Sequence, residues 1–204
     1  STTTATPVTV AAKSESNERT VVVQNALYRV EFSNRGGVVK SWQLLKYMDD
    51  NKPQRVLDVV HPEAAQQTGG WPLSVVLDNP ELEKAANNGL YQVSPGSGDG
   101  TLTAPADLEF SWSDGHLEII KHFHFEHSYA MHADVTAKLD GKPITAGLGW
   151  LGGFGDLTVT NPAPVETVST YYSESGKITN FPYKKLEDID KWGPGVWQGG
   201  KDFT

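Results

Sequence analysis

Two β-patterned runs joined by a short glycine turn constrain the fold of this chain more than any other feature. They lie in residues 20–47. Tyr28, Val30 and Phe32 alternate with polar side chains, which is the period-2 pattern of a strand with one buried face. The runs are joined by Asn-Arg-Gly-Gly at residues 34–37, and glycine readily adopts the positive φ angles at which a chain can reverse. We therefore predict a β-hairpin here.

Turn-forming residues divide the rest of the chain into short segments. The 204 residues include 20 Gly and 12 Pro, which favours many short strands over long helices. Strand patterns occupy residues 108–112, 117–125 and 129–139. One helix start is clear, since Asn79 can cap a helix that has Pro80 at its first position. The sequence predicts an all-β, antiparallel sandwich with one or two short helices, the second over residues 184–192.

Composition excludes several classes of function. The net charge is −8, the calculated pI is about 5.2 and no run of Lys and Arg stands out, so nucleic acid is not an expected partner. The absence of cysteine excludes disulfides, thiolate zinc sites and a cysteine nucleophile. No apolar run reaches the roughly 18 residues of a membrane-spanning helix. Any membrane contact is therefore expected through helices absent from this chain.

The first residues differ in composition from the rest. Residues 1–19 are rich in Ser, Thr, Ala and charged side chains and offer little apolar surface to bury, which predicts a flexible linker. Residues 20–204 are predicted to form one β-sandwich domain, a length that allows a substantial core.

One polar face could bind a metal. On the strand predicted for residues 117–125, Glu118, His122 and His124 share a face, and Glu126 continues it. Two histidines at i and i+2 with nearby carboxylates form a reasonable zinc or iron ligand set. A solvated strand face explains the same residues without a ligand. We predict surface, with no metal and no cofactor.

Two further motifs carry little functional weight. Residues 147–152 match the G-x-G-x-x-G pattern, but a glycine-rich and β-branched stretch follows where dinucleotide binding needs a helix. Trp42, Trp71, Trp112 and Trp150 could line a groove for a sugar or peptide, although strand aromatics more often belong to the core. No activated nucleophile or convergent acid and base pair is visible, so no catalytic residue is predicted.

Three blocks resemble the periplasmic domain of YidC-type membrane protein insertases. They are the hairpin at residues 20–47 with its Arg-Gly-Gly turn, the strand pair at 117–139, and the glycine-rich strand at 148–152. The resemblance implies a β-supersandwich like that of galactose mutarotases, on the periplasmic face of the bacterial inner membrane. It places the end of the chain before the aromatic-rich strands that close the domain in relatives, so a C-terminally truncated sandwich is an expectation.

The same resemblance implies a non-catalytic function. Such a domain would support the insertion or folding of inner-membrane proteins through contacts with Sec translocon components or nascent membrane proteins, while the inserting helical core lies outside this chain. A shared fold does not import sugar chemistry. The alternative is a secreted carbohydrate-binding or aldose-epimerase-like protein that uses the same sandwich.

Overall fold

The computed structural model describes residues 11–96, 100–150, 156, 158, 170–174 and 177–181. The chain divides into two compact units, Ser1–Leu157 and Thr158–Thr204, and each is described by itself. The second unit contains one antiparallel hairpin, β13 (Thr170–Glu174) with β14 (Lys177–Phe181). The helix predicted over residues 184–192 lies outside the described residues.

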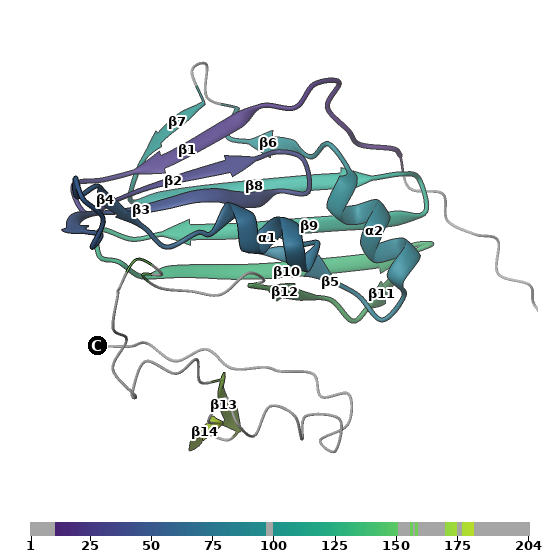
Figure 1. Cartoon of the computed structure of the whole chain (residues 1–204). Coiled ribbons are helices and arrows are strands. Elements are labelled where there is room, and N and C mark those ends of the chain that lie inside the picture. Colours follow the sequence, from purple (N-terminus) through teal and green to yellow (C-terminus); the bar gives the residue numbers. More distant parts are fainter. Residues whose placement is uncertain are drawn as a thin grey trace, which may run out of the picture. The chain divides into compact units, whose positions relative to one another are not determined.

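The first unit is a β-sandwich, as predicted, and it carries two short helices (Figure 1). One five-stranded sheet has the order β4-β3-β2-β1-β7 and the other has the order β11-β10-β9-β8-β6, while β12 pairs with β5. The elements are β1 (Thr20–Gln24), β2 (Tyr28–Ser33), β3 (Val38–Met48), β4 (Val56–Asp58), α1 (Pro62–Thr68), β5 (Ser74–Val76), α2 (Pro80–Asn88), β6 (Gln92–Ser94), β7 (Thr101–Thr103), β8 (Ala106–Ser113), β9 (Leu117–Phe125), β10 (Met131–Leu139), β11 (Lys142–Ile144) and β12 (Gly147–Gly149).

The predicted hairpin is present as β2 and β3, with Gly36 and Gly37 at φ 72° and 57° in its turn. The first run differs from the prediction because it contains two strands. Asn25 breaks it: its side-chain oxygen accepts hydrogen bonds from the backbone N–H groups of Leu27 and Tyr28. This Asx turn folds β1 back onto β2. The pairing of β1 with β7 is parallel, in an otherwise antiparallel sandwich.

Aromatic side chains join the two sheets. Phe32 of β2 lies 5.3 to 6.0 Å, between ring centroids, from Phe110 of β8 and from Phe123 and Phe125 of β9. All four are fully buried. Contacts between aromatic rings stabilise the fold beyond the free energy gained by burying the rings. These four side chains therefore stabilise the packing of the two sheets against each other.

The helix at Asn79 forms as predicted, because the Asn79 side chain accepts hydrogen bonds from the N–H groups of Glu81 and Leu82. Helix α1 was not predicted. It begins at Pro62 without a side-chain cap, so its only sequence signals are that proline and Glu63 in its first turn. Neither described helix is long and apolar enough to cross a membrane.

Residues 11–19 contact the sandwich. Lys13 forms a β-bridge with Ser113 at the end of β8, and the Glu15 N–H donates to the Leu90 carbonyl. Glu15 also pairs with Arg19, and the Arg19 N–H donates to the side chain of Asn34. A boundary between linker and domain at residue 19 stays a prediction.

Candidate binding site

An apolar pocket of about 410 Å³ lies beside β3 and the start of β10. Strand β3, the turn before β10 and the segment after β12 all contribute side chains to it. Its lining consists of Trp42, Leu44, Tyr47, Val59, Leu73, Tyr129, Met131 and Trp150. This lining contains no charged side chain, so the pocket suits an apolar group.

Two aromatic pairs shape the pocket. The rings of Trp42 and Trp150 lie 5.9 Å apart, and those of Tyr47 and Tyr129 lie 6.2 Å apart. Partial desolvation raises the pKa of the Tyr129 hydroxyl, and the Tyr47 hydroxyl beside it adds to the shift. Each tyrosine presents an apolar ring with a polar hydroxyl at its tip.

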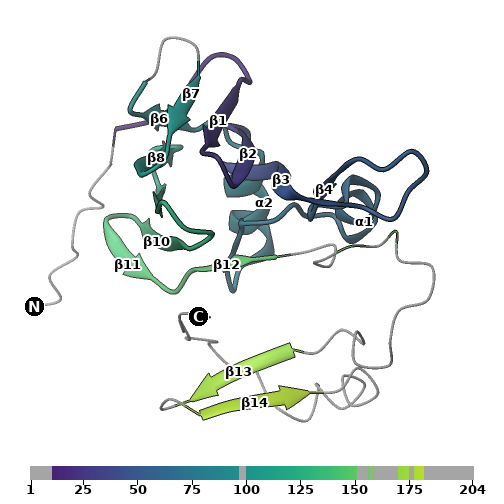
Figure 2. The ribbon, with the colours of Figure 1, turned by 90° about the vertical axis from the view of Figure 1, so that its left-hand side faces the viewer.

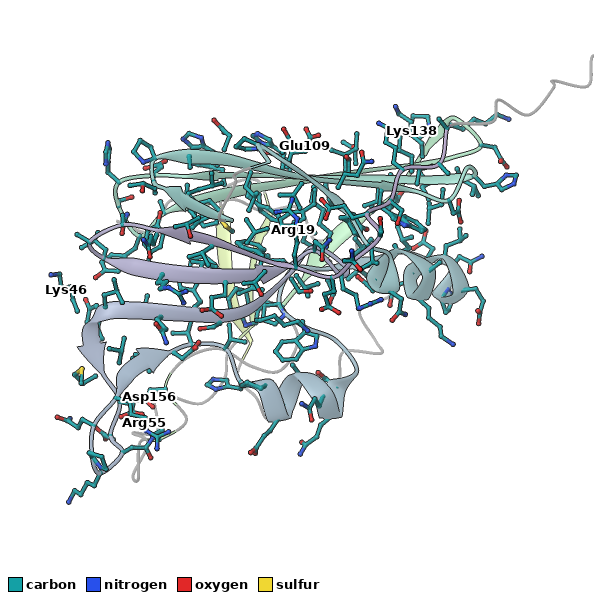
Figure 3. The ribbon with its side chains drawn as sticks, turned by 90° about the horizontal axis from the view of Figure 1, so that it is seen from above. Arg19, Lys46, Arg55, Glu109, Lys138 and Asp156 are labelled. Atoms are coloured by element: carbon teal, nitrogen blue, oxygen red, sulfur yellow. The ribbon has the colours of Figure 1, made fainter. Side chains whose placement is uncertain are left out.

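Apolar side chains continue outside the pocket along β3. The pairing of β3 with β2 ends at Leu44, which lies opposite Tyr28 at the start of β2. Strand β3 continues beyond this point. Leu45, Tyr47 and Met48 are 37%, 52% and 50% exposed, and Tyr129 from the opposite sheet is 41% exposed. Lys46 lies among them at the far end of the strand and points away from the sandwich (Figure 3). A grouped set of exposed apolar side chains marks an interaction surface more often than isolated ones do.

Leu73 forms part of the pocket wall with an unusual backbone. Its φ is 66°, in the left-handed region that a branched side chain disfavours. Two hydrogen bonds hold it: its N–H donates to the Gly149 carbonyl at 2.7 Å, and its carbonyl accepts from Lys121 Nζ at 2.7 Å. Backbone strain of this kind persists only where surrounding contacts maintain it.

Lys121 is the residue that sequence reasoning missed. It lies on the inner face of β9 and is fully buried. Its ammonium group donates to the carbonyls of Gly36 and Gly37 at 2.6 and 3.2 Å, besides that of Leu73. Burial lowers the pKa of Lys121 to about 7. The lysine thus links the β2–β3 turn to a wall of the pocket.

The polar face predicted on β9 is present on the outer side of its sheet, where Figure 3 shows neighbouring Glu109 and Lys138 projecting outward. His122 and His124 both approach Asp107 Oδ1, at 3.5 and 2.8 Å. Glu126 instead bonds His132, and Glu118 bonds Lys138. The four predicted residues therefore lie on one face but have different partners.

No set of three His, Asp or Glu side chains within the described ranges is placed to hold one metal ion. The absence of a metal site stays a prediction. The bond to His132, with smaller contributions from Ser128 and the other charges nearby, lowers the pKa of Glu126. The carboxylate is therefore ionised at neutral pH, as expected of a solvated face.

The four tryptophans and the glycine motif lie in different parts of the fold. Trp112 is 8% exposed and belongs to the core, whereas Trp42 and Trp150 line the pocket. Trp71 lies under the ammonium group of Lys40, 3.6 Å from the ring centroid. Gly147 and Gly149 lie in β12, antiparallel to β5, and residues 151–152 of the motif lie outside the described residues.

Comparison with known proteins identifies the family. The family model of the YidC periplasmic domain matches residues 20–191. A search of curated proteins gives no match. The matched range starts at β1 and extends over most of the chain, which includes the sandwich, the pocket and Lys121. The chain belongs to the YidC periplasmic domain family, and so represents a periplasmic domain of a membrane protein insertase.

Proposed function

We propose that this domain supports membrane protein insertion by holding hydrophobic segments of its clients at the apolar pocket. The observation that carries the proposal is the continuity of an uncharged, aromatic-lined pocket with the exposed apolar side chains of β3. Burial of apolar surface stabilises such a contact by roughly 25 cal/mol per Å². A segment on its way into a bilayer has that surface exposed and gains most from covering it.

The role we propose is non-catalytic. The pocket lining contains no carboxylate, histidine, lysine, serine or threonine, and its two tyrosines have no such group beside them in the lining to form a catalytic set. On the polar face, the carboxylates pair with histidine or lysine on a solvated surface. A contact site that binds and releases its client matches these features better than an active site does.

We further propose that the domain lies at the periplasmic face of the inner membrane and is anchored through helices outside this chain. Components of the Sec translocon are proposed as additional partners. The net charge of −8 argues against docking on anionic lipid, because a surface for such lipid carries clustered Lys and Arg. Protein segments are therefore the favoured partners.

A crosslinking experiment in the full-length insertase tests the pocket. A photoreactive amino acid at Tyr47, at the rim, should crosslink to a membrane protein substrate during its insertion. The matched control position is Lys142, an exposed residue of β11 outside the pocket lining. Equal crosslinking from the two positions, or none from Tyr47 while insertion proceeds, would refute the proposal.

A further inference from the structure

Strand β10 is paired along only part of its outer edge. On one side, β9 pairs with it over its full length, Met131–Leu139. On the other side, β11 pairs only with residues 137–139. Figure 1 shows β11 at the end of β10 that is remote from Met131. Among the described strands, residues 131–136 therefore have no partner on that side, and an unpaired strand edge can template another strand.

Hydrogen bonds at the two ends of the β9–β10 pair show which N–H and C=O groups of β10 point toward β9. At one end the Glu126 N–H donates to the Ala130 carbonyl, and at the other the Asp140 N–H donates to the His116 carbonyl. In an antiparallel pair, residues alternate between bonding toward the partner and pointing away from it. Even-numbered residues of β10 therefore bond to β9. Met131, Ala133 and Val135 direct their N–H and C=O groups to the unpaired edge.

The side chains of these three residues lie on the inner face, next to the pocket. Met131 is part of the pocket lining. Ala133 is exposed. Its partner on β9, Phe123, and the partner of Phe123 on β8, Leu108, are both fully buried. The inner face is thus open beside Ala133, although β12 contacts β10 and pairs with β5. A strand added at the open part would place alternate side chains beside Met131 and the pocket.

Charge on the opposite face favours one kind of segment. Asp134 lies on the outer face of β10 and is exposed. Within the part of the chain that the structure describes, its carboxylate forms no hydrogen bond or ion pair, and Glu109 lies in the same row two strands away. A strand added to this edge would place its own outer side chains beside Asp134. A basic side chain there is favoured and an acidic one is disfavoured.

We propose that the Met131–Thr136 edge of β10 binds an extended client segment by strand addition, with apolar side chains facing the pocket and basic side chains facing Asp134. The inference deepens the function proposed above and rests on it, because the same pocket receives the apolar side chains. Backbone bonds to three residues give the contact its register, and the pocket selects the alternating apolar positions.

The test uses the 204-residue chain and a fluorescein-labelled peptide of alternating valine and lysine, followed by fluorescence anisotropy. Ala133→Pro removes one outward N–H without removing any bond to β9, and proline is tolerated on edge strands. We expect roughly tenfold weaker binding, which corresponds to the loss of about one hydrogen bond. Ala133→Val retains the N–H and should bind like the wild type.

Two further measurements test the charge preference at Asp134 and the role of the pocket separately. Replacing lysine by glutamate in the peptide should abolish binding to the wild type, and Asp134→Lys should reverse the preference. Tyr129→Asp places a charge at the apolar pocket rim and should weaken binding of the valine-lysine peptide. If Tyr129→Asp weakens binding but Ala133→Pro does not, strand addition is wrong and the pocket function stands. If neither Tyr129→Asp nor Ala133→Pro changes the affinity for the peptide, the pocket function and strand addition are both wrong.

Two controls keep the result decisive. If Ala133→Pro lowers the unfolding midpoint, the wild-type chain is tested instead with a peptide whose alternate backbone nitrogens are methylated, and unchanged affinity would overturn the proposal. Sedimentation of the chain alone tests a second copy as the occupant. Self-association that Ala133→Pro abolishes would assign this edge to a dimer and overturn the assignment to a client.

Discussion

At the scale of single residues, Lys121 joins three segments of the core through one buried side chain. It supplies the hydrogen-bond donor for the carbonyls of Gly36, Gly37 and Leu73 inside the core. Buried carbonyls that lose their donor cost roughly 1–3 kcal/mol each. Part of that cost is offset, because a methionine would not have to bury a charge.

We therefore expect Lys121→Met to lower the free energy of unfolding by about 2 kcal/mol at pH 6. The effect should grow with pH. The folded-state pKa of Lys121 is about 7, below the ordinary value of 10.5. Between these values the unfolded chain holds a proton that the folded protein has released, so rising pH stabilises the wild type relative to the variant.

Urea unfolding at pH values from 6 to 9 measures this difference. Lys138→Met is the matched control, because Lys138 is 47% exposed and pairs with Glu118 on the surface. Its effect should be small and should not increase over this range. A stability difference for Lys121→Met that stays constant from pH 6 to pH 9 would contradict the lowered pKa.

Sequence alone could not assign this role to Lys121. The alternation of β9 correctly placed Leu117, Ile119 and Phe123 on the inner face and the histidines on the outer face. The same alternation puts residue 121 inside, but a lysine is almost never fully buried without a partner. Its partners are backbone carbonyls from two distant loops, which leave no signal in a side-chain pattern.

At the scale of elements, the β2–β3 turn shows how closely two segments approach. A Cβ added at Gly36 would lie 2.6 Å from the carbonyl oxygen of Asn87 at the end of α2. The Gly36 N–H donates to the Gly89 carbonyl, so the turn and the helix end are in direct backbone contact. Glycine is required here both for the positive φ and for the approach of α2.

Comparing Gly36→Ala with Gly69→Ala separates these two effects. Both glycines have φ near 72°, but a Cβ at Gly69 would meet nothing within 4 Å. We expect Gly69→Ala to cost about 1 kcal/mol, the strain of a left-handed residue. Gly36→Ala should cost about 3 kcal/mol, because α2 must also move. Thermal unfolding measures the stability of the two variants. Equal losses of stability would show that the close approach of Gly36 to α2 does not add to the cost of the substitution.

Prediction of elements from sequence succeeded where local chemistry decides the structure. The cap at Asn79, the glycine turn at residues 34–37 and the strand at 117–125 each follow from neighbouring residues. Helix α1 was missed, because its polar sequence has no side-chain cap and only Ala65 is buried. The turn at Asn25 was missed because the polar Gln24 and Asn25 continue an otherwise regular strand pattern.

At the scale of the whole molecule, the candidate site could be read from the sequence only in part: Trp42 and Trp150 were two of four tryptophans considered for a groove, but a core position was favoured for all four. Its aromatic pairs join β3 to residues about 80 and 110 positions later, Tyr47 to Tyr129 and Trp42 to Trp150. Such pairs form only when both sheets and β12 are in place. The family resemblance predicted the sandwich correctly, but it did not predict where an apolar pocket would form.

The function proposed for the domain also makes a prediction at this scale. If the domain only supports insertion, full-length insertase that lacks residues 20–191 should still insert a Sec-independent substrate, at a reduced rate, in a depleted strain. Immunoblotting of the membrane fraction verifies that the shortened protein is present. Complete loss of insertion by a stable, correctly localised protein would show an essential role for the domain.

The parallel pairing of β1 with β7 has a consequence for the order of folding. Strand β1 lies inside its sheet, yet one of its two neighbours, β7, is not reached until Thr101. A chain that is synthesised from its N-terminus therefore presents β1 with one open side until β7 has also emerged. Until then, the position of β7 beside β1 is open to a chaperone or to a strand of a second nascent chain.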